Sequence, residues 1–133
     1  MAGVEVVENE IEKGLDIVGT GDMGIGNTTP SAAIAAALTG IEPAKLAGRG
    51  TGVDDEGLKR KIDAIERALA TNKPDPQDGL DVLSKVGGFE IAGLAGVADR
   101  ALQDPLRPDG VVRGEAPRVA RCRLGQDLIV QDL

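Results

Sequence analysis

The pattern of apolar and polar positions predicts helices over most of the first 96 residues. In the segment 58–69 an apolar residue falls at i, i+4, i+7 and i+11, which is the spacing of one face of an amphipathic helix. Asp54 and Asp55 precede this segment, and either side chain can cap the start of the helix. Apolar patterns of the same kind predict shorter helices near the N-terminus, over 80–86 and from residue 89 onward.

One short segment departs from this pattern. Residues 15–18 are mostly apolar, end in two β-branched side chains and are bounded by glycines, so they predict a buried strand. The glycine loop GTGDMGIGNTT follows at 19–29 (the first loop), and Thr29 with Pro30 predicts the start of an alanine-rich helix over 31–39. A strand, a loop and a helix in this order, among further helices, predict a helix-rich α/β fold.

The first loop has the composition of a phosphate site. It offers many backbone N–H groups, threonine hydroxyls and one amide, and no basic residue lies between Lys13 and Lys45. Its G-x-G-x-x-G run lacks the strand-end acid expected about 20 residues on, which disfavours a dinucleotide fold. Its G-x-x-x-x-G-x-T run has Asn27 where a P-loop has lysine, which disfavours a triphosphate and a small P-loop kinase. A phosphomonoester with about two negative charges fits better, and a tight turn without a ligand is the alternative.

A second glycine cluster, GRGTG, lies at 48–52 (the second loop). Successive small residues allow N–H groups to converge on an anion, and Arg49 can add a charge-assisted hydrogen bond to a phosphate. Lys59, one turn into the next predicted helix, can reach the same anion. The alternatives are a flexible turn between two helices and a lysine that is only solvated.

Composition and charge exclude several classes of function. The net charge is −7 and the isoelectric point is about 4.6, so nucleic acid is not an expected partner. No apolar run approaches the length of a membrane span, so no membrane role is expected, and the first residues do not resemble a signal peptide. With no histidine and a single cysteine, Cys122, the chain has no ligand set for structural zinc. We therefore expect no metal, no cofactor and a cytoplasmic location.

Residue usage changes at Gly96. Residues 97–133 contain no lysine, only arginine as a basic residue, and scattered prolines. The chain is therefore predicted to divide into residues 1–96 and an atypical tail, residues 97–133. A shifted reading frame would produce such a tail, and we expect the tail to stay outside the fold. The alternative is a real extension in which residues 111–112 pair with residues 128–130 as short strands.

Three long motifs resemble one enzyme family. In chain order they are GDMGIGNTTPSAAIAAALTG, GRGTGVDDEGLKRKI and DGLDVLSKVGGFEIAGLAG. They resemble the nicotinate-nucleotide–dimethylbenzimidazole phosphoribosyltransferases, and the likeness runs from about residue 5 to Gly96. The resemblance implies an α/β fold with a parallel, Rossmann-like sheet, a smaller helical domain and a homodimer. It also implies a step of cobalamin synthesis, in which nicotinate mononucleotide and 5,6-dimethylbenzimidazole give α-ribazole 5′-phosphate and nicotinate.

By motif position, the resemblance implies a phosphoribosyl site formed by the two loops. Its residues are Gly24, Gly26, Asn27 and Thr28 on the first loop, Gly48, Arg49, Gly50 and Thr51 on the second, and Lys59 as a further contact.

The resemblance leaves the catalytic base open. The family uses a glutamate near its C-terminal end, which has no counterpart in this chain, and many members have glutamate where this chain has Asp22. A contact made by that carboxylate is then shorter by about one methylene. Asp22, Asp54, Asp55 and Glu90 are the carboxylates that can substitute as base; Asp54 and Asp55 resemble helix-start acids, and Asp22 is kept as a candidate. We expect a fragment that is weakly active or inactive and that takes nicotinate mononucleotide and a benzimidazole base. A non-catalytic module that binds a mononucleotide is the alternative.

Overall fold

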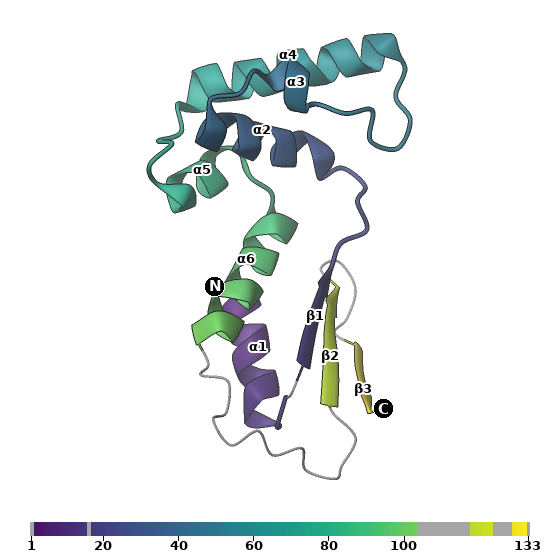
Figure 1. The fold of residues 1–133 in the computed structure, drawn as a ribbon, viewed down its shortest axis with the longest axis vertical. Coiled ribbons are helices and arrows are strands. Elements are labelled where there is room, and N and C mark those ends of the chain that lie inside the picture. The colour runs from purple at the N-terminus through teal and green to yellow at the C-terminus, as the bar shows by residue number, and fades with distance from the viewer. Residues whose placement is uncertain (1, 16, 104–117, 124–128, 133) are drawn as a thin grey trace. The chain divides into compact units, whose positions relative to one another are not determined.

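The computed structural model describes residues 2–15, 17–103, 118–123 and 129–132 (Figure 1). Contacts between residues divide the chain into two compact units, each with its own hydrophobic core. Unit 1 comprises Met1–Met23 and Ala92–Leu133, and unit 2 comprises Gly24–Ile91. The described residues form a helix-rich α/β structure, as the sequence predicts.

Unit 2 is built from helices. They are α2 (Thr28–Thr39), α3 (Pro43–Leu46), α4 (Asp55–Asn72), α5 (Gly79–Val86) and the first residues of α6 (Phe89–Gln103). The core of the unit joins α2, α4 and α5, and its buried members are Ala32, Ala33, Ile65, Val82 and Val86. Because alanines on the inner face of α2 let the neighbouring helices approach closely, this core fills without an aromatic ring. The one phenylalanine, Phe89, is 98% exposed.

Local hydrogen bonds explain where α4 begins and ends. The N-cap residue is Asp54, whose carboxylate accepts a hydrogen bond from the Gly57 N–H at 2.7 Å. At the other end, Lys73 takes a positive φ of 45° and donates its N–H to the Leu69 carbonyl. Of the two acids that the sequence offers as caps, Asp54 therefore serves, and the predicted amphipathic helix is confirmed.

Helix α2 begins earlier than the sequence predicts. The prediction that Thr29 caps this helix is wrong, because the helix starts at Thr28 with Asn27 at the N-cap position. Pro30 still falls in the first turn, where the missing N–H has no helical partner to lose. The short helix α3, which starts at Pro43, is not predicted by any apolar period.

Unit 1 combines helices with a small mixed sheet (Figure 1). Helix α1 (Ala2–Glu12) precedes β1 (Ile17–Gly21), and β2 (Arg118–Arg123) and β3 (Ile129–Asp132) complete a sheet of order β1-β2-β3. Strands β1 and β2 are parallel, and β2 and β3 are antiparallel. The strand predicted at 15–18 is present, but it starts at Ile17, and its pairing with β2 carries it through Gly21 into the predicted first loop. The expectation that this strand is buried is wrong, because none of its residues is buried and Ile17 is 53% exposed.

Helices α1 and α6 pack backbone to backbone within unit 1. A Cβ atom on Gly3 would lie 2.0 Å from the Gly93 carbonyl oxygen, so a larger residue at position 3 requires the helices to shift. Val7 and Val97 are buried in the core of this unit. Glycine at the helix contact therefore allows branched side chains of the two helices to bury one another.

The predicted boundary at Gly96 falls inside α6, which continues well beyond it. Val97 is fully buried, and Arg100 Nε lies 3.3 Å from Glu8 Oε1 on α1. The expectation that the fold ends at Gly96 is therefore wrong for the rest of this helix. Of the alternative strand pairing, residues 111–112 lie outside the described residues, and β3 pairs with β2 instead.

Candidate functional site

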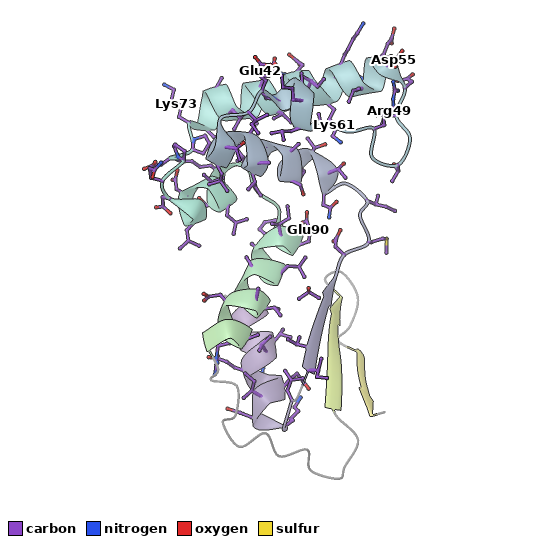
Figure 2. All side chains as sticks on the ribbon, in the orientation of Figure 1. Glu42, Arg49, Asp55, Lys61, Lys73 and Glu90 are labelled. Carbon is purple, nitrogen blue, oxygen red and sulfur yellow. The ribbon has the colours of Figure 1, made fainter. Side chains whose placement is uncertain are left out.

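The ammonium of Lys61 joins the two glycine loops (Figure 2). Lys61 Nζ donates one hydrogen bond to Thr28 Oγ1 at 2.8 Å and another to the Gly48 carbonyl oxygen at 2.9 Å. Thr28 lies near the end of the first loop and is the first residue of α2, Gly48 begins the second loop, and Lys61 lies in the second turn of α4. Three segments that are far apart in the chain therefore meet at one positive charge.

The helical phase of α4 places Lys61 beside α2. Lys61 follows Leu58 by three residues and precedes the buried Ile65 by four, so it borders the apolar face of α4 that packs against α2. A lysine at such a border can lay its aliphatic stem along the apolar face and keep its ammonium at the edge. This position explains how a charged residue reaches both loops.

The second loop approaches Thr28 closely at Gly50. A Cβ atom on Gly50 would lie 3.1 Å from Thr28 Oγ1, and Gly50 has a φ of +56°, which residues with a side chain rarely adopt. The backbone conformation favours glycine here, and a side chain at this position would also displace the Thr28 hydroxyl by a few tenths of an ångström. On the first loop, Gly24 and Gly26 also have positive φ, of 76° and 85°, where the chain turns into α2.

Asn27 contacts the first turn of α2 through its backbone carbonyl oxygen. Its carbonyl oxygen accepts hydrogen bonds from the Ser31 N–H at 3.0 Å and from Ser31 Oγ at 2.8 Å, and its side chain does not cap the helix. The N–H groups of the first turn carry the positive end of the helix dipole. A phosphate group at this end of α2 would accept hydrogen bonds from such groups.

The guanidinium of Arg49 contacts residues that follow the second loop. Arg49 Nη1 donates a hydrogen bond to the Val53 carbonyl oxygen at 3.0 Å. Arg49 Nη2 pairs with the Asp55 carboxylate in the first turn of α4 (Figure 2). The arginine that the sequence offers as a phosphate ligand therefore has one partner directly after its own loop and one at the start of the next helix.

The structure gathers part of the predicted site and adds one residue to it. Thr28, Gly48 and Gly50 come together, and the other predicted loop residues, Gly24, Gly26, Asn27, Arg49 and Thr51, also belong to unit 2. Lys59 is exposed, and no hydrogen bond or ion pair joins it to a loop in the described part of the chain. Lys61 is absent from the predicted set, although its helical phase distinguishes it from Lys59.

The candidate bases are carboxylates that differ in their location and in their hydrogen-bond and ion-pair partners. The carboxylate of Asp54 caps α4, and that of Asp55 pairs with Arg49. Asp22 is exposed and belongs to unit 1, and Glu90 lies in the first turn of α6. Asp54 and Asp55 thus have structural partners already, and a role for Asp22 as base stays a prediction.

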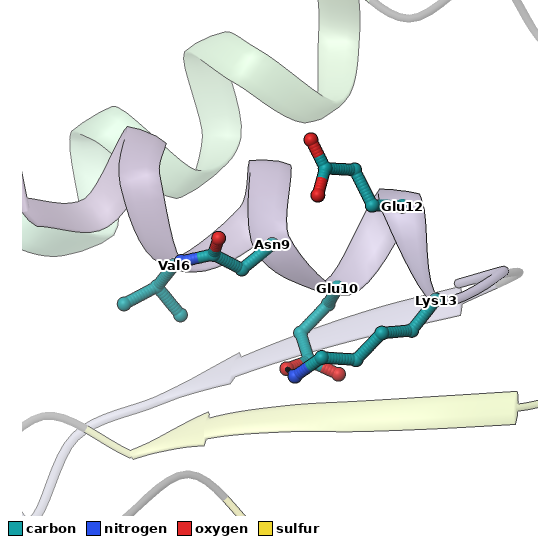
Figure 3. Close-up of a pocket in the computed structure, with 5 residues that line it drawn as sticks. All are labelled: Val6, Asn9, Glu10, Glu12 and Lys13. Carbon is teal, nitrogen blue, oxygen red and sulfur yellow. Dashed lines mark hydrogen bonds and ion pairs between the residues drawn. The ribbon is translucent and has the colours of Figure 1, made fainter.

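A pocket opens beside α1 in unit 1 (Figure 3). Its volume is about 430 Å³, and its lining residues are Val6, Asn9, Glu10, Glu12 and Lys13. The Glu10 side chain is only 7% exposed and accepts a hydrogen bond from Lys13 Nζ at 2.7 Å. The sequence does not single out these residues, and the paired buried carboxylate makes the pocket unsuited to a phosphate.

The described part of the chain contains no group of three or more histidine, cysteine, aspartate or glutamate side chains that could hold a metal ion. Nor does any of its helices have both the length and the apolar character that crossing a membrane requires.

A family model described as phosphoribosyltransferase matches residues 1–123. The chain belongs to this phosphoribosyltransferase family. The family indicated by the three motifs is thus confirmed. The expectation that the likeness stops at Gly96 is wrong, because the match continues through α6 and β2.

Curated phosphoribosyltransferases similar to the chain carry the name nicotinate-nucleotide–dimethylbenzimidazole phosphoribosyltransferase. The one from Desulforudis audaxviator is 58% identical over 121 residues, which cover 90% of the chain and 34% of the relative. The one from Roseiflexus sp. is 56% identical over 121 residues, with the same coverage of 90% and 34%. The one from Dehalococcoides mccartyi is 52% identical over 120 residues, which cover 89% and 34%. The chain thus spans about a third of the length of the curated relatives it matches.

Proposed function

We propose that the chain forms the phosphate-binding part of an enzyme that transfers a phosphoribosyl group. The donor is nicotinate mononucleotide and the acceptor 5,6-dimethylbenzimidazole, and the products are α-ribazole 5′-phosphate and nicotinate in the assembly of the nucleotide loop of cobalamin. The names of the relatives support the reaction. The observation that carries the proposal is the Lys61 ammonium held between Thr28 and Gly48.

Lys61 supplies the positive charge that the first loop lacks. A phosphomonoester carries about two negative charges near neutral pH, and neutral N–H groups with a helix dipole offset only part of them. An ammonium between the two loops offsets more of this charge. A triphosphate carries more negative charge than this one ammonium and the N–H groups can offset. The backbone N–H groups and hydroxyls come from Gly24, Gly26, Asn27 and Thr28 on the first loop and from Gly48, Arg49, Gly50 and Thr51 on the second.

Anchoring the phosphate fixes the reacting carbon of the ribose. In the transfer, a ring nitrogen of the benzimidazole forms a bond to C1′, the bond from C1′ to the pyridine nitrogen breaks, and nicotinate leaves with the bonding electron pair. The proton on the other benzimidazole nitrogen passes to a base. Binding energy gained at the remote phosphate can be used to orient C1′ for this attack.

We further propose that the chain alone binds the nucleotide but turns it over slowly. Asp54 and Asp55 are committed to structural contacts, and the chain spans about a third of its relatives. A parallel, Rossmann-like sheet, a homodimer and a cytoplasmic location of the full-length enzyme belong to the same proposal. The parallel pair β1 and β2 supports its sheet.

Calorimetry with nicotinate mononucleotide and with the dephosphorylated riboside tests the binding step. We expect the chain to bind the mononucleotide more tightly, because the loops recognise the phosphate. Equal affinity for the two compounds would contradict the proposal. Incubation with mononucleotide and dimethylbenzimidazole then tests turnover. Rapid formation of α-ribazole 5′-phosphate would show a complete active site, and its loss in Asp22→Asn would identify the base.

A further inference from the structure

The second loop is tied to the start of α4 through both the backbone and the side chain of Arg49. The N–H groups of Gly52 and Val53 each donate to the Arg49 carbonyl oxygen at 3.1 Å. The guanidinium donates to the Val53 carbonyl oxygen at 3.0 Å and pairs with Asp55. Arg49 therefore closes a tight ring of contacts around residues 49–55.

The first two residues of the second loop are each attached to α4 by a side chain of that helix. The first turn of α4 is fixed by the hydrogen bond from the Gly57 N–H to the Asp54 carboxylate, at 2.7 Å, which holds Asp55 in place. The carbonyl of Gly48 is held by Lys61 of α4, at 2.9 Å. The loop thus has one attachment at Gly48 and one at Arg49, and both depend on charged side chains of α4.

We propose that Asp55 is a positioning residue, which acts through Arg49 to clamp the second loop in its binding shape. The negative charge of Asp55 balances the positive charge of the Arg49 guanidinium, so the pair adds little net attraction for a phosphate. Arg49 then serves the geometry of the loop, and Lys61 supplies the charge. The phosphate role of the loop rests on the proposed function, whereas the clamp itself is a property of the chain without ligand.

The amide hydrogens of Gly52 and Val53 report on the clamp, because both donate to the backbone carbonyl oxygen of Arg49, inside the segment that the guanidinium closes. Asp55→Asn and Arg49→Gln should each raise the exchange rates of the Gly52 and Val53 amides by about two- to five-fold, because an exposed ion pair contributes a free energy of that size. NMR on the full chain without ligand measures these rates. The double variant should exchange no faster than either single variant, and Asp55→Glu should restore most of the protection. Glu56→Gln is the matched control, since it removes the neighbouring first-turn carboxylate, whose ion pair is with Arg60.

Nucleotide binding decides between the clamp and a direct role for Arg49. If Arg49 positions the loop, Asp55→Asn weakens the binding of nicotinate mononucleotide, as Arg49→Gln does. If Arg49 is instead a phosphate ligand for which Asp55 competes, Asp55→Asn releases it and tightens binding, which would overturn the proposal. Unchanged amide exchange in both single variants would overturn it as well. A wild-type chain that fails to bind the mononucleotide would count against the proposed function, and the exchange rates would still decide the clamp.

Discussion

In the proposed phosphate site, Lys61 joins the two loops and also offers a donor to the ligand. An ammonium has three N–H donors, and in the described part of the chain Thr28 and Gly48 accept two of them. The third donor can serve a phosphate oxygen without breaking the contacts that hold the loops. The same residue can therefore hold the two loops together and, in the proposed site, bind a phosphate.

Replacing Lys61 by methionine should weaken the binding of nicotinate mononucleotide at least about ten-fold. The change removes a charged hydrogen-bond donor, which is worth roughly 1.5–3 kcal/mol, and keeps a flexible apolar stem. Lys59→Met is the matched control, because Lys59 is exposed on the same helix and should leave the affinity unchanged. Calorimetry on both variants checks this, and equal losses would mean that only the overall charge of α4 matters.

Asp81 is a residue whose charge stabilises the fold in a defined range of pH. A hydrogen bond from the Lys85 side chain, and a second from the Asp75 N–H, hold the pKa of Asp81 below its ordinary value. Because the folded pKa is the lower one, this stabilisation is present above the ordinary aspartate value, about 4, and is lost as the pH falls through the folded value.

Asp81→Asn should therefore lower the free energy of unfolding near neutral pH. The gap between variant and wild type should shrink as the pH falls below about 4, where Asp81 of the unfolded chain is already protonated. Urea unfolding at a series of pH values measures the gap. A gap that stays constant down to the most acidic value would assign the loss to packing rather than to charge.

At the scale of elements, the sequence predicts those whose limits are set locally. The apolar face of α4, its cap at Asp54 and the glycines after α5 are all visible in the sequence. Strand β1 extends to Gly21 because of its pairing with β2, which lies about 100 residues further along the chain, so no local pattern reveals its end. Likewise, the loops are visible as glycine clusters, but the choice of Lys61 over Lys59 depends on how α4 packs against α2.

The contact between α1 and α6 gives a prediction at the same scale. Gly3→Ala should destabilise unit 1 by about 1–3 kcal/mol, the usual cost of overpacking, because the new Cβ would lie 2.0 Å from the Gly93 carbonyl oxygen. Gly79→Ala is the control, since nothing lies within 4 Å of a Cβ at that helical position. Amide exchange of α1 and α6 measures the effect, and equal stability of the two variants would contradict the close helix contact.

At the scale of the whole molecule, the two hydrophobic cores are made by different parts of the chain. The core of unit 2 comes from α2, α4 and α5, which also carry or flank the two loops, whereas Val7 and Val97 form the core of unit 1. The second loop and residues 24–29 of the first loop therefore belong to unit 2, whereas residues 19–23 belong to unit 1. Damage to unit 1 should leave the amide protection of α2 and α4 intact.

Two truncations test what the residues after Gly96 contribute. A chain that ends at Gly96 loses the buried Val97 and the ion pair of Arg100 with Glu8. We expect the amides of α1 to exchange faster in it than in a chain that ends at Gln103. The longer truncated chain still lacks β2, so its β1 amides should exchange faster than those of the full chain.

The β1 amides therefore decide between the two accounts of the segment beyond Gln103. If that segment is the atypical tail that its residue usage predicts, removing it leaves the exchange of Ile17–Gly21 unchanged. If that segment instead belongs to the fold, as the pairing of β2 with β1 over Ile17–Gly21 indicates, its removal exposes one edge of β1 to solvent and the protection of those amides falls. The family match through residue 123 favours the second outcome, and the amides of α4 serve as the internal reference in both chains.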